Sequence, residues 1–157
     1  MLHLTLKFLG EVSEEALGPL QSDMALALAA QRGFSLGLTG LRAVPSPAAA
    51  SMIWVVVDDP SGECVQVAKS LDAVGLRHGF TPETRRFTPH VTLVRARRPR
   101  AVAAEALADV SAVSELGIQC SVSVLSATLF SSELTPHGPR HKALVEFPFR
   151  DEQDSAK

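Results

Sequence analysis

The opening segment of the chain alternates strictly between apolar and polar residues. The apolar residues recur at every second position: Leu2, Leu4, Leu6 and Phe8. A period of two predicts a β-strand with one buried face, because successive side chains of a strand point to opposite sides. His3 and Thr5 therefore share the opposite, polar face of this predicted strand.

The rest of the pattern predicts strands and helices in the order β, α, β, β, α, β, α, β, β. Helical spacing of apolar residues places helices near 13–28, 62–77 and 101–113. Apolar or alternating runs place the later strands near 34–38, 51–59, within 81–100, and near 121–130 and 142–147. Trp54 lies in the most apolar of these strands and is expected in the core, with a stacking platform as the alternative.

Composition narrows the class of protein. The chain has 157 residues, of which 46% are hydrophobic and 20% charged, as in a single globular domain. Its net charge of −2 gives no overall attraction to nucleic acid. Cys64 and Cys120 are too far apart for a CxxC zinc motif. No apolar run or signal-like segment indicates a membrane or secretion, so we expect a cytoplasmic protein.

One tetrapeptide pattern occurs twice, each time in a predicted strand. His3-Leu4-Thr5-Leu6 matches His90-Val91-Thr92-Leu93 at every position except one conservative change. In each copy the His and the Thr lie on the same side of the strand, away from the apolar side. Ordinary strand histidines are the alternative, but they do not account for the repeated spacing.

Two imidazoles and two hydroxyls suit cleavage of a phosphate ester. A neutral imidazole can take a proton from water while a protonated one gives a proton to the leaving oxygen, and each role typically contributes about 10²–10⁴-fold. Histidine provides both forms near neutral pH. The Thr5 and Thr92 hydroxyls can donate hydrogen bonds to the non-bridging phosphate oxygens, where negative charge grows.

These motifs resemble those of the 2H phosphoesterases, most closely the branch of RNA 2′,3′-cyclic phosphodiesterases and 2′-5′ RNA ligases. The resemblance is carried by the stretches HLTLKFLGEV, RRFTPHVTLVRA and SELTPHGPRHKALVEFPF. It implies one bilobal α+β domain over residues 1–157, with two antiparallel sheets and flanking helices around a central groove. The two motifs are expected to face each other in that groove.

The resemblance also implies an activity and the roles of the paired residues. The expected reaction is metal-free hydrolysis of a terminal RNA 2′,3′-cyclic phosphate to a 2′-phosphomonoester, with reversible 2′-5′ RNA ligation as related chemistry. His3 would act as the acid toward the 3′-oxygen and His90 as the base that activates water. Thr5 and Thr92 would bind the phosphate, and no metal or other cofactor is expected.

Arg95 matches the arginine that follows the second motif in this family and binds phosphate. It lies five residues after His90, so a regular strand sends its side chain to the opposite face. A role in the site therefore requires a β-bulge or the end of the strand near Val94. A solvated arginine is the alternative. The surrounding RARRPR stretch suits a phosphate-rich ligand, with a solvated loop as its alternative.

The chain departs from the family pattern at two places. Family members usually carry an apolar strand and a helix before the first motif, whereas here the motif begins at His3. We therefore expect Met1 to be an internal residue of a longer reading frame, or the chain to be shortened. His141 stands where the family often has a tyrosine. It either lines the groove or caps a hairpin.

Three other functions remain open at the level of sequence. The same site could act on a small cyclic nucleotide, such as an ADP-ribose cyclic phosphate, instead of RNA ends. The chain could also be an RNA- or nucleotide-binding module with impaired catalysis. A metal-dependent enzyme ranks last, because the sequence has no histidine–aspartate cluster with ligand spacing, and Gly138-Pro139 between His137 and His141 disfavours their joint ligation.

Overall fold

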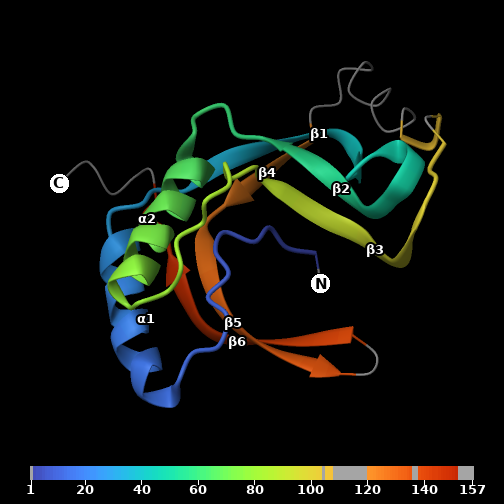
Figure 1. The fold of residues 1–157 in the computed structure, drawn as a ribbon. Coiled ribbons are helices and arrows are strands. Elements are labelled where there is room, and N and C mark those ends of the chain that lie inside the picture. Colours follow the sequence, from blue (N-terminus) through green and yellow to red (C-terminus); the bar gives the residue numbers. More distant parts are fainter. Residues whose placement is uncertain (1, 104, 108–119, 136–137, 152–157) are drawn as a thin grey trace. The chain divides into compact units, whose positions relative to one another are not determined.

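The computed structural model describes residues 2–103, 105–107, 120–135 and 138–151 (Figure 1). The helix expected over 101–113 falls largely outside these ranges. The chain divides into two compact units, each assembled from separate stretches of sequence. The first unit comprises Met1–Phe8, Ser35–Ala68 and Glu83–Val122, and the second comprises Leu9–Phe34, Lys69–Pro82 and Ser123–Lys157.

The predicted α+β class is confirmed, with one antiparallel hairpin and one larger sheet. The larger sheet has the strand order β3-β2-β1-β4, and its strands are β1 Phe34–Val44, β2 Ala50–Asp58, β3 His90–Arg100 and β4 Cys120–Val124. β2 pairs antiparallel with both β1 and β3. A short 3-10 helix, η1 Pro47–Ala49, occupies the connection between β1 and β2. Among the described residues, no helix has the length and hydropathy of a membrane span.

Helix α2, Glu63–Arg77, follows β2 as predicted. The Asp59 carboxylate accepts hydrogen bonds from the backbone N–H groups of Cys64 at 3.2 Å and Val65 at 3.0 Å. These donors belong to the first helical turn, which has no intrahelical acceptors, so Asp59 caps the helix from outside it. Gly79 follows the helix with φ of 80°, a conformation that favours glycine.

The two cysteines differ in their surroundings, and this difference predicts their reactivity. The Cys64 side chain is 1% exposed, whereas Cys120 is exposed. Burial, with a smaller contribution from the Asp59 charge, raises the pKa of the Cys64 thiol to about 12. The thiolate is the reactive form, so a raised pKa leaves Cys64 protonated and inert.

We therefore expect a thiol reagent at pH 8 to modify one cysteine per native chain, and a second only after unfolding. Mass spectrometry of the labelled chain should place the native label on Cys120. A Cys120→Ser variant should then show no rapid labelling. Equal rates at both thiols would contradict the buried environment of Cys64.

Helix α1, Glu14–Leu28, belongs to the second unit. It begins where the apolar spacing predicts, and Ser13 is its N-cap, because the Ser13 hydroxyl accepts a hydrogen bond from the Ala16 N–H at 3.3 Å. Its apolar side buries Leu20, Met24 and Leu28. Next to Met24, the partly buried Asp23 carboxylate lies 2.9 Å from Nε2 of His78, just beyond the end of α2.

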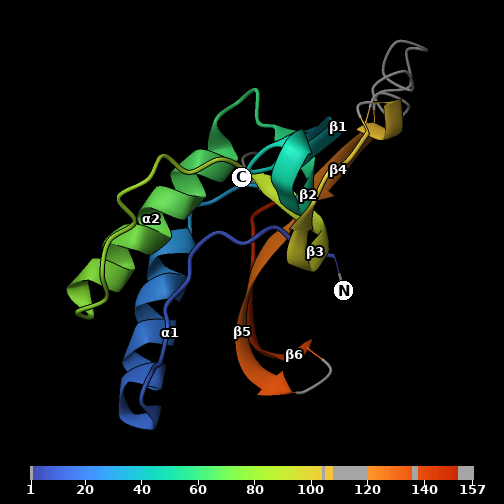
Figure 2. The same cartoon turned by 45° about the vertical axis from the view of Figure 1, so that its right-hand side comes forward.

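The second unit also contains the hairpin of β5 Ser126–Thr135 and β6 Gly138–Pro148 (Figure 2). The single strand expected near 121–130 is therefore wrong: β4 and β5 are separate strands in different sheets. Leu125 separates the two strands. Its carbonyl accepts a hydrogen bond from the Phe149 N–H at 2.8 Å. Phe149 stacks on Phe34 with ring centroids 5.9 Å apart.

The opening segment forms less strand than its alternation predicts. Among the described residues before α1, the only β-type pairing is an isolated antiparallel bridge between Leu4 and Val91. Leu2 is 68% exposed and Phe8 is 82% exposed, so their predicted burial is wrong. A period of two sets which residues share a face, but burial requires a covering layer, which these two positions lack.

Candidate active site

The bridge between Leu4 and Val91 brings the two His-x-Thr motifs together in the first unit. In an antiparallel pair with this register, Thr5 lies opposite His90 and His3 lies opposite Thr92. Directly opposite residues share a face with Cβ atoms about 5 Å apart, and diagonal residues such as His3 and His90 are about 7–8 Å apart. This register places both imidazoles on the same side of the paired segments.

Strand β2 shows which residues of β3 lie on this same face. Val56 pairs with His90, Trp54 with Thr92, and Met52 with Arg95. The three β2 residues are two positions apart, so their side chains point to one side of the sheet. Their partners on β3 do the same, and we call this side the site face.

Arg95 reaches the site face because β3 has a bulge. Ile53 pairs with Val94 while the next residue, Trp54, pairs with Thr92, which leaves Leu93 as an extra residue on β3. An extra residue reverses the alternation beyond it. This is the bulge near Val94 that the sequence requires for a role of Arg95 in the site. RARRPR is also not a loop, because β3 extends through it to Arg100.

His90 is held from two directions. Its Nδ1 atom lies 2.9 Å from the carbonyl oxygen of Thr88. The carbonyl can only accept, so Nδ1 donates, and in the neutral ring Nε2 carries the free lone pair. The indole of Trp54 stacks on the imidazole with centroids 3.8 Å apart and planes inclined by 21°. The ring plane and the tautomer are therefore both set by neighbouring groups.

The sequence did not predict that Trp54 belongs to the site. It is half-buried against His90 rather than enclosed in the core, and its buried Nε1 has no hydrogen-bond partner among the described residues. All residues from Met52 to Val57 are apolar, so alternation carries no signal of the face on which Trp54 lies. Arg42 on β1 pairs with Trp54, which puts this exposed arginine on the site face as well.

The site residues remain accessible to solvent. Thr5, His90 and Thr92 are half-buried, and His3 and Arg95 are exposed. Within the described part of the chain, no group of three or more His, Cys, Asp or Glu has the arrangement of a metal site. The assembled chemistry is that of two imidazoles, two hydroxyls and one guanidinium, a set suited to acid–base catalysis on an anion.

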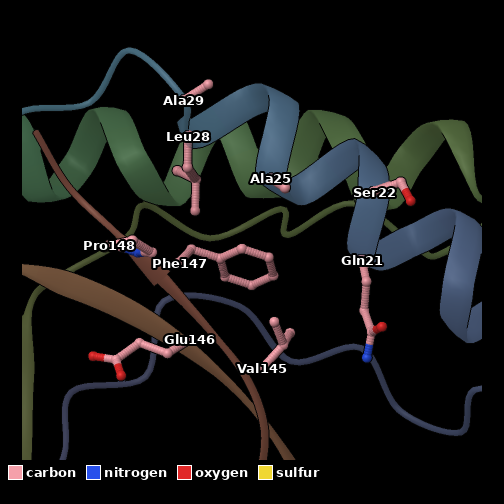
Figure 3. Close-up of a pocket in the computed structure, with 9 residues that line it drawn as sticks. All are labelled: Gln21, Ser22, Ala25, Leu28, Ala29, Val145, Glu146, Phe147 and Pro148. Atoms are coloured by element: carbon pink, nitrogen blue, oxygen red, sulfur yellow. The ribbon is translucent and has the colours of Figure 1, made fainter.

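The second unit has a cavity of ≈ 340 Å³ between α1 and β6 that none of these residues lines (Figure 3). Its walls include the apolar side chains of Leu28, Val145 and Phe147. The carboxylate of Glu146, at its edge, accepts a hydrogen bond from the Ser126 hydroxyl at 2.6 Å. The described residues that line the cavity include no histidine, cysteine, lysine or arginine side chain that could act as a base, a nucleophile or a phosphate ligand.

His141, the residue in the tyrosine position, lies on β6 of the second unit. Its ring meets Phe130 of β5 edge-on, with centroids 6.3 Å apart. His141 thus packs within the β5–β6 hairpin. His137 lies outside the described residues.

Comparison with known proteins finds relatives that are similar to this chain over most of its length. The family model of the 2′-5′ RNA ligase superfamily matches residues 1–134. A protein of Aeropyrum pernix named RNA 2′,3′-cyclic phosphodiesterase is 37% identical over 148 residues, covering 92% of this chain and 80% of the relative. One of the same name from Methanothermobacter thermautotrophicus is 34% identical, with coverage of 93% and 77%.

Solved structures agree with the sequence relatives. A Thermus thermophilus crystal structure aligns with a TM-score of 0.74 at 26% identity, covering 97% of this chain and 80% of that one. Escherichia coli LigT complexed with 3′-AMP aligns with a TM-score of 0.69 at 28% identity, covering 94% and 76%. The α+β fold is thus shared with these structures.

Proposed function

Because the chain belongs to the 2′-5′ RNA ligase superfamily, we propose that it hydrolyses terminal 2′,3′-cyclic phosphates of RNA to 2′-phosphomonoesters. Relatives named RNA 2′,3′-cyclic phosphodiesterase support this activity. The observation that carries the proposal is the pairing of Leu4 with Val91, which aligns the two His-x-Thr motifs. The chemistry needs no metal in this proposal, since both proton transfers are assigned to imidazoles.

His90 is the general base in the proposed reaction. Its Nε2 atom carries the lone pair because Nδ1 donates to the Thr88 carbonyl. Nε2 takes a proton from water as the water oxygen attacks phosphorus. The bond from phosphorus to the 3′-oxygen breaks, and the protonated His3 gives its proton to that oxygen. The 2′-oxygen keeps the phosphate, so the product is a 2′-phosphomonoester.

Three further residues stabilise the negative charge of the transition state. The hydroxyls of Thr5 and Thr92 donate hydrogen bonds to non-bridging phosphate oxygens. Arg95, on the same face by its register with Met52, presents a guanidinium that can bind two of these oxygens at once. With an RNA 5′-hydroxyl in place of water, the same steps form a 2′-5′ phosphodiester and release the 3′-hydroxyl.

The decisive experiment uses an oligoribonucleotide that ends in a 2′,3′-cyclic phosphate, with EDTA present, over pH 5 to 9. We expect turnover to a 2′-phosphate with a bell-shaped pH profile, because one imidazole must be neutral and the other protonated. Binding without turnover at any pH would instead indicate a binding module. Activity that EDTA abolishes and a divalent cation restores would show that a metal takes part.

Trp54 is expected to support catalysis indirectly, by holding the imidazole of His90 in its orientation. Trp54→Leu removes the stacked ring, so the imidazole can rotate away from its productive orientation, and kcat should fall about tenfold with little change in KM. Trp54→Phe keeps a stacking face and should recover most of the activity. Steady-state kinetics on the cyclic phosphate measures the split between kcat and KM. Equal losses in the Leu and Phe variants would show that stacking is not what positions His90.

A further inference from the structure

A run of arginines follows the site along β3. Arg97, Arg98 and Arg100 are all exposed, and we call these three residues the arginine strip. The whole chain has a net charge of −2, so the strip is a local concentration of positive charge rather than a reflection of composition. A concentration of this kind indicates a binding surface for an anionic partner.

The charges of the strip are not neutralised within the described structure. The ion pairs found there involve Arg77 and His78 with Asp23, in the second unit. No carboxylate of the described residues pairs with Arg97, Arg98 or Arg100. Within the described part of the chain, the three guanidiniums therefore have no ionic partner that would compete with an anionic ligand.

The strip follows the site along the same strand, and the backbone is held at both of its ends. β3 is the edge strand of the sheet and runs from His90 to Arg100. Pairing of Arg100 with Ala50 and a 2.8 Å hydrogen bond from the Val102 N–H to the Pro47 carbonyl hold its far end. Arg95 pairs with Met52 and Arg100 pairs with Ala50, so β3 advances five residues where β2 advances two. The extra residues of β3, among them Arg97 and Arg98, therefore lie outside the regular ladder.

The length of this surface suits several nucleotides. The register along β2 runs from Val56, opposite His90, to Ala50, opposite Arg100. At about 3.3 Å per residue this distance is roughly 20 Å. Stacked nucleotides advance about 3.4 Å each along a strand, so the surface spans up to about six of them.

We propose that the arginine strip binds the phosphates of the RNA strand that precedes the cyclic phosphate end. This inference rests on the proposed function, in which the terminal phosphate lies between His3 and His90. Arg95 contacts the terminal phosphate itself, and the next phosphates of a bound RNA then meet the strip beyond it. Contacts to phosphates carry no base information, so binding depends on length and not on sequence.

The test compares a hexaribonucleotide and a mononucleotide, each ending in a 2′,3′-cyclic phosphate. Neutralising two charges, in Arg97→Gln/Arg98→Gln, should raise KM for the hexamer about tenfold at low salt and leave KM for the mononucleotide unchanged. Each lost phosphate contact on a single strand lowers the salt slope of log K by about 0.7, so the slope should fall by about 1.4. The matched control is Lys69→Gln/Arg77→Gln, which removes the same charge from the second unit and should change neither value.

Binding of a fluorescent hexamer that already ends in a 2′-phosphate gives a readout that needs no turnover. Its Kd and salt slope should change in the strip variant by the same factors. If the strip and control variants behave alike on the hexamer, the strip is not the RNA surface, even where the mononucleotide is hydrolysed. If wild type hydrolyses neither substrate but the strip variant binds the hexamer less well, the strip stands and the proposed catalysis fails.

Discussion

His90→Asn is expected to lower kcat on a 2′,3′-cyclic phosphate end by about 10²–10⁴-fold, the usual contribution of a general base. Asparagine is the informative replacement because its amide N–H can still donate to the Thr88 carbonyl, as Nδ1 of His90 does. What it lacks is the second nitrogen that takes the proton from water. Single-turnover kinetics at the pH optimum measures this step directly, and KM should change little.

The variant must be shown to fold before the loss is assigned to chemistry. Its thermal unfolding midpoint should stay close to that of wild type, since the hydrogen bond to Thr88 is kept. His3→Gln should lose activity to a similar degree. Because both residues act on one transition state, the double variant should be about as inactive as the worse single variant. An asparagine variant that retains nearly full activity would remove His90 from the mechanism.

Exchanging two neighbouring residues of β3 should disable phosphate binding without changing composition or charge. In Val94→Arg/Arg95→Val the arginine pairs with Ile53 instead of Met52, so it points away from the site face. Val94 is 54% exposed, so an arginine there remains solvated. The lost charge-assisted hydrogen bond is worth about 1.5–3 kcal/mol, which corresponds to a decrease in kcat/KM of about 10–150-fold.

Arg95→Gln is the matched comparison for the exchange. If position on the face is what matters, the exchange and the glutamine variant should lose kcat/KM to the same extent. Binding of a 2′-phosphate product by titration should weaken in parallel. If the exchanged chain works as well as wild type while Arg95→Gln is impaired, general positive charge near the site would account for the effect, and the bulge would have no functional role.

Several elements were predictable because local chemistry decides them. The cap at Ser13, the end of α2 before Gly79 and the apolar strand around Trp54 all follow from the preferences of single residues and short patterns. The opening segment shows the limit of such reasoning. Its alternation is real, yet Leu2 and Phe8 are exposed, because burial depends on what covers a strand.

The division of 121–130 into two strands shows a second limit. Nothing in the apolar pattern marks Leu125 as a break, because the break is set by the partners of each part. β4 joins the larger sheet and β5 pairs with β6, whose sequence lies after it. Which distant strand pairs with which depends on the tertiary fold, so a short stretch of sequence does not contain this information.

The sequence alone determined which groups this protein brings to its chemistry: the repeated His-x-Thr spacing, Arg95 and the arginine strip are all visible in it. Tertiary structure decided how they meet. The bridge at Leu4–Val91 aligns the motifs, the extra residue Leu93 turns Arg95 to their face, and Trp54 stacks on His90. Residue identity and spacing are local properties of a chain, whereas strand register, bulges and ring stacking arise only from pairing between distant segments.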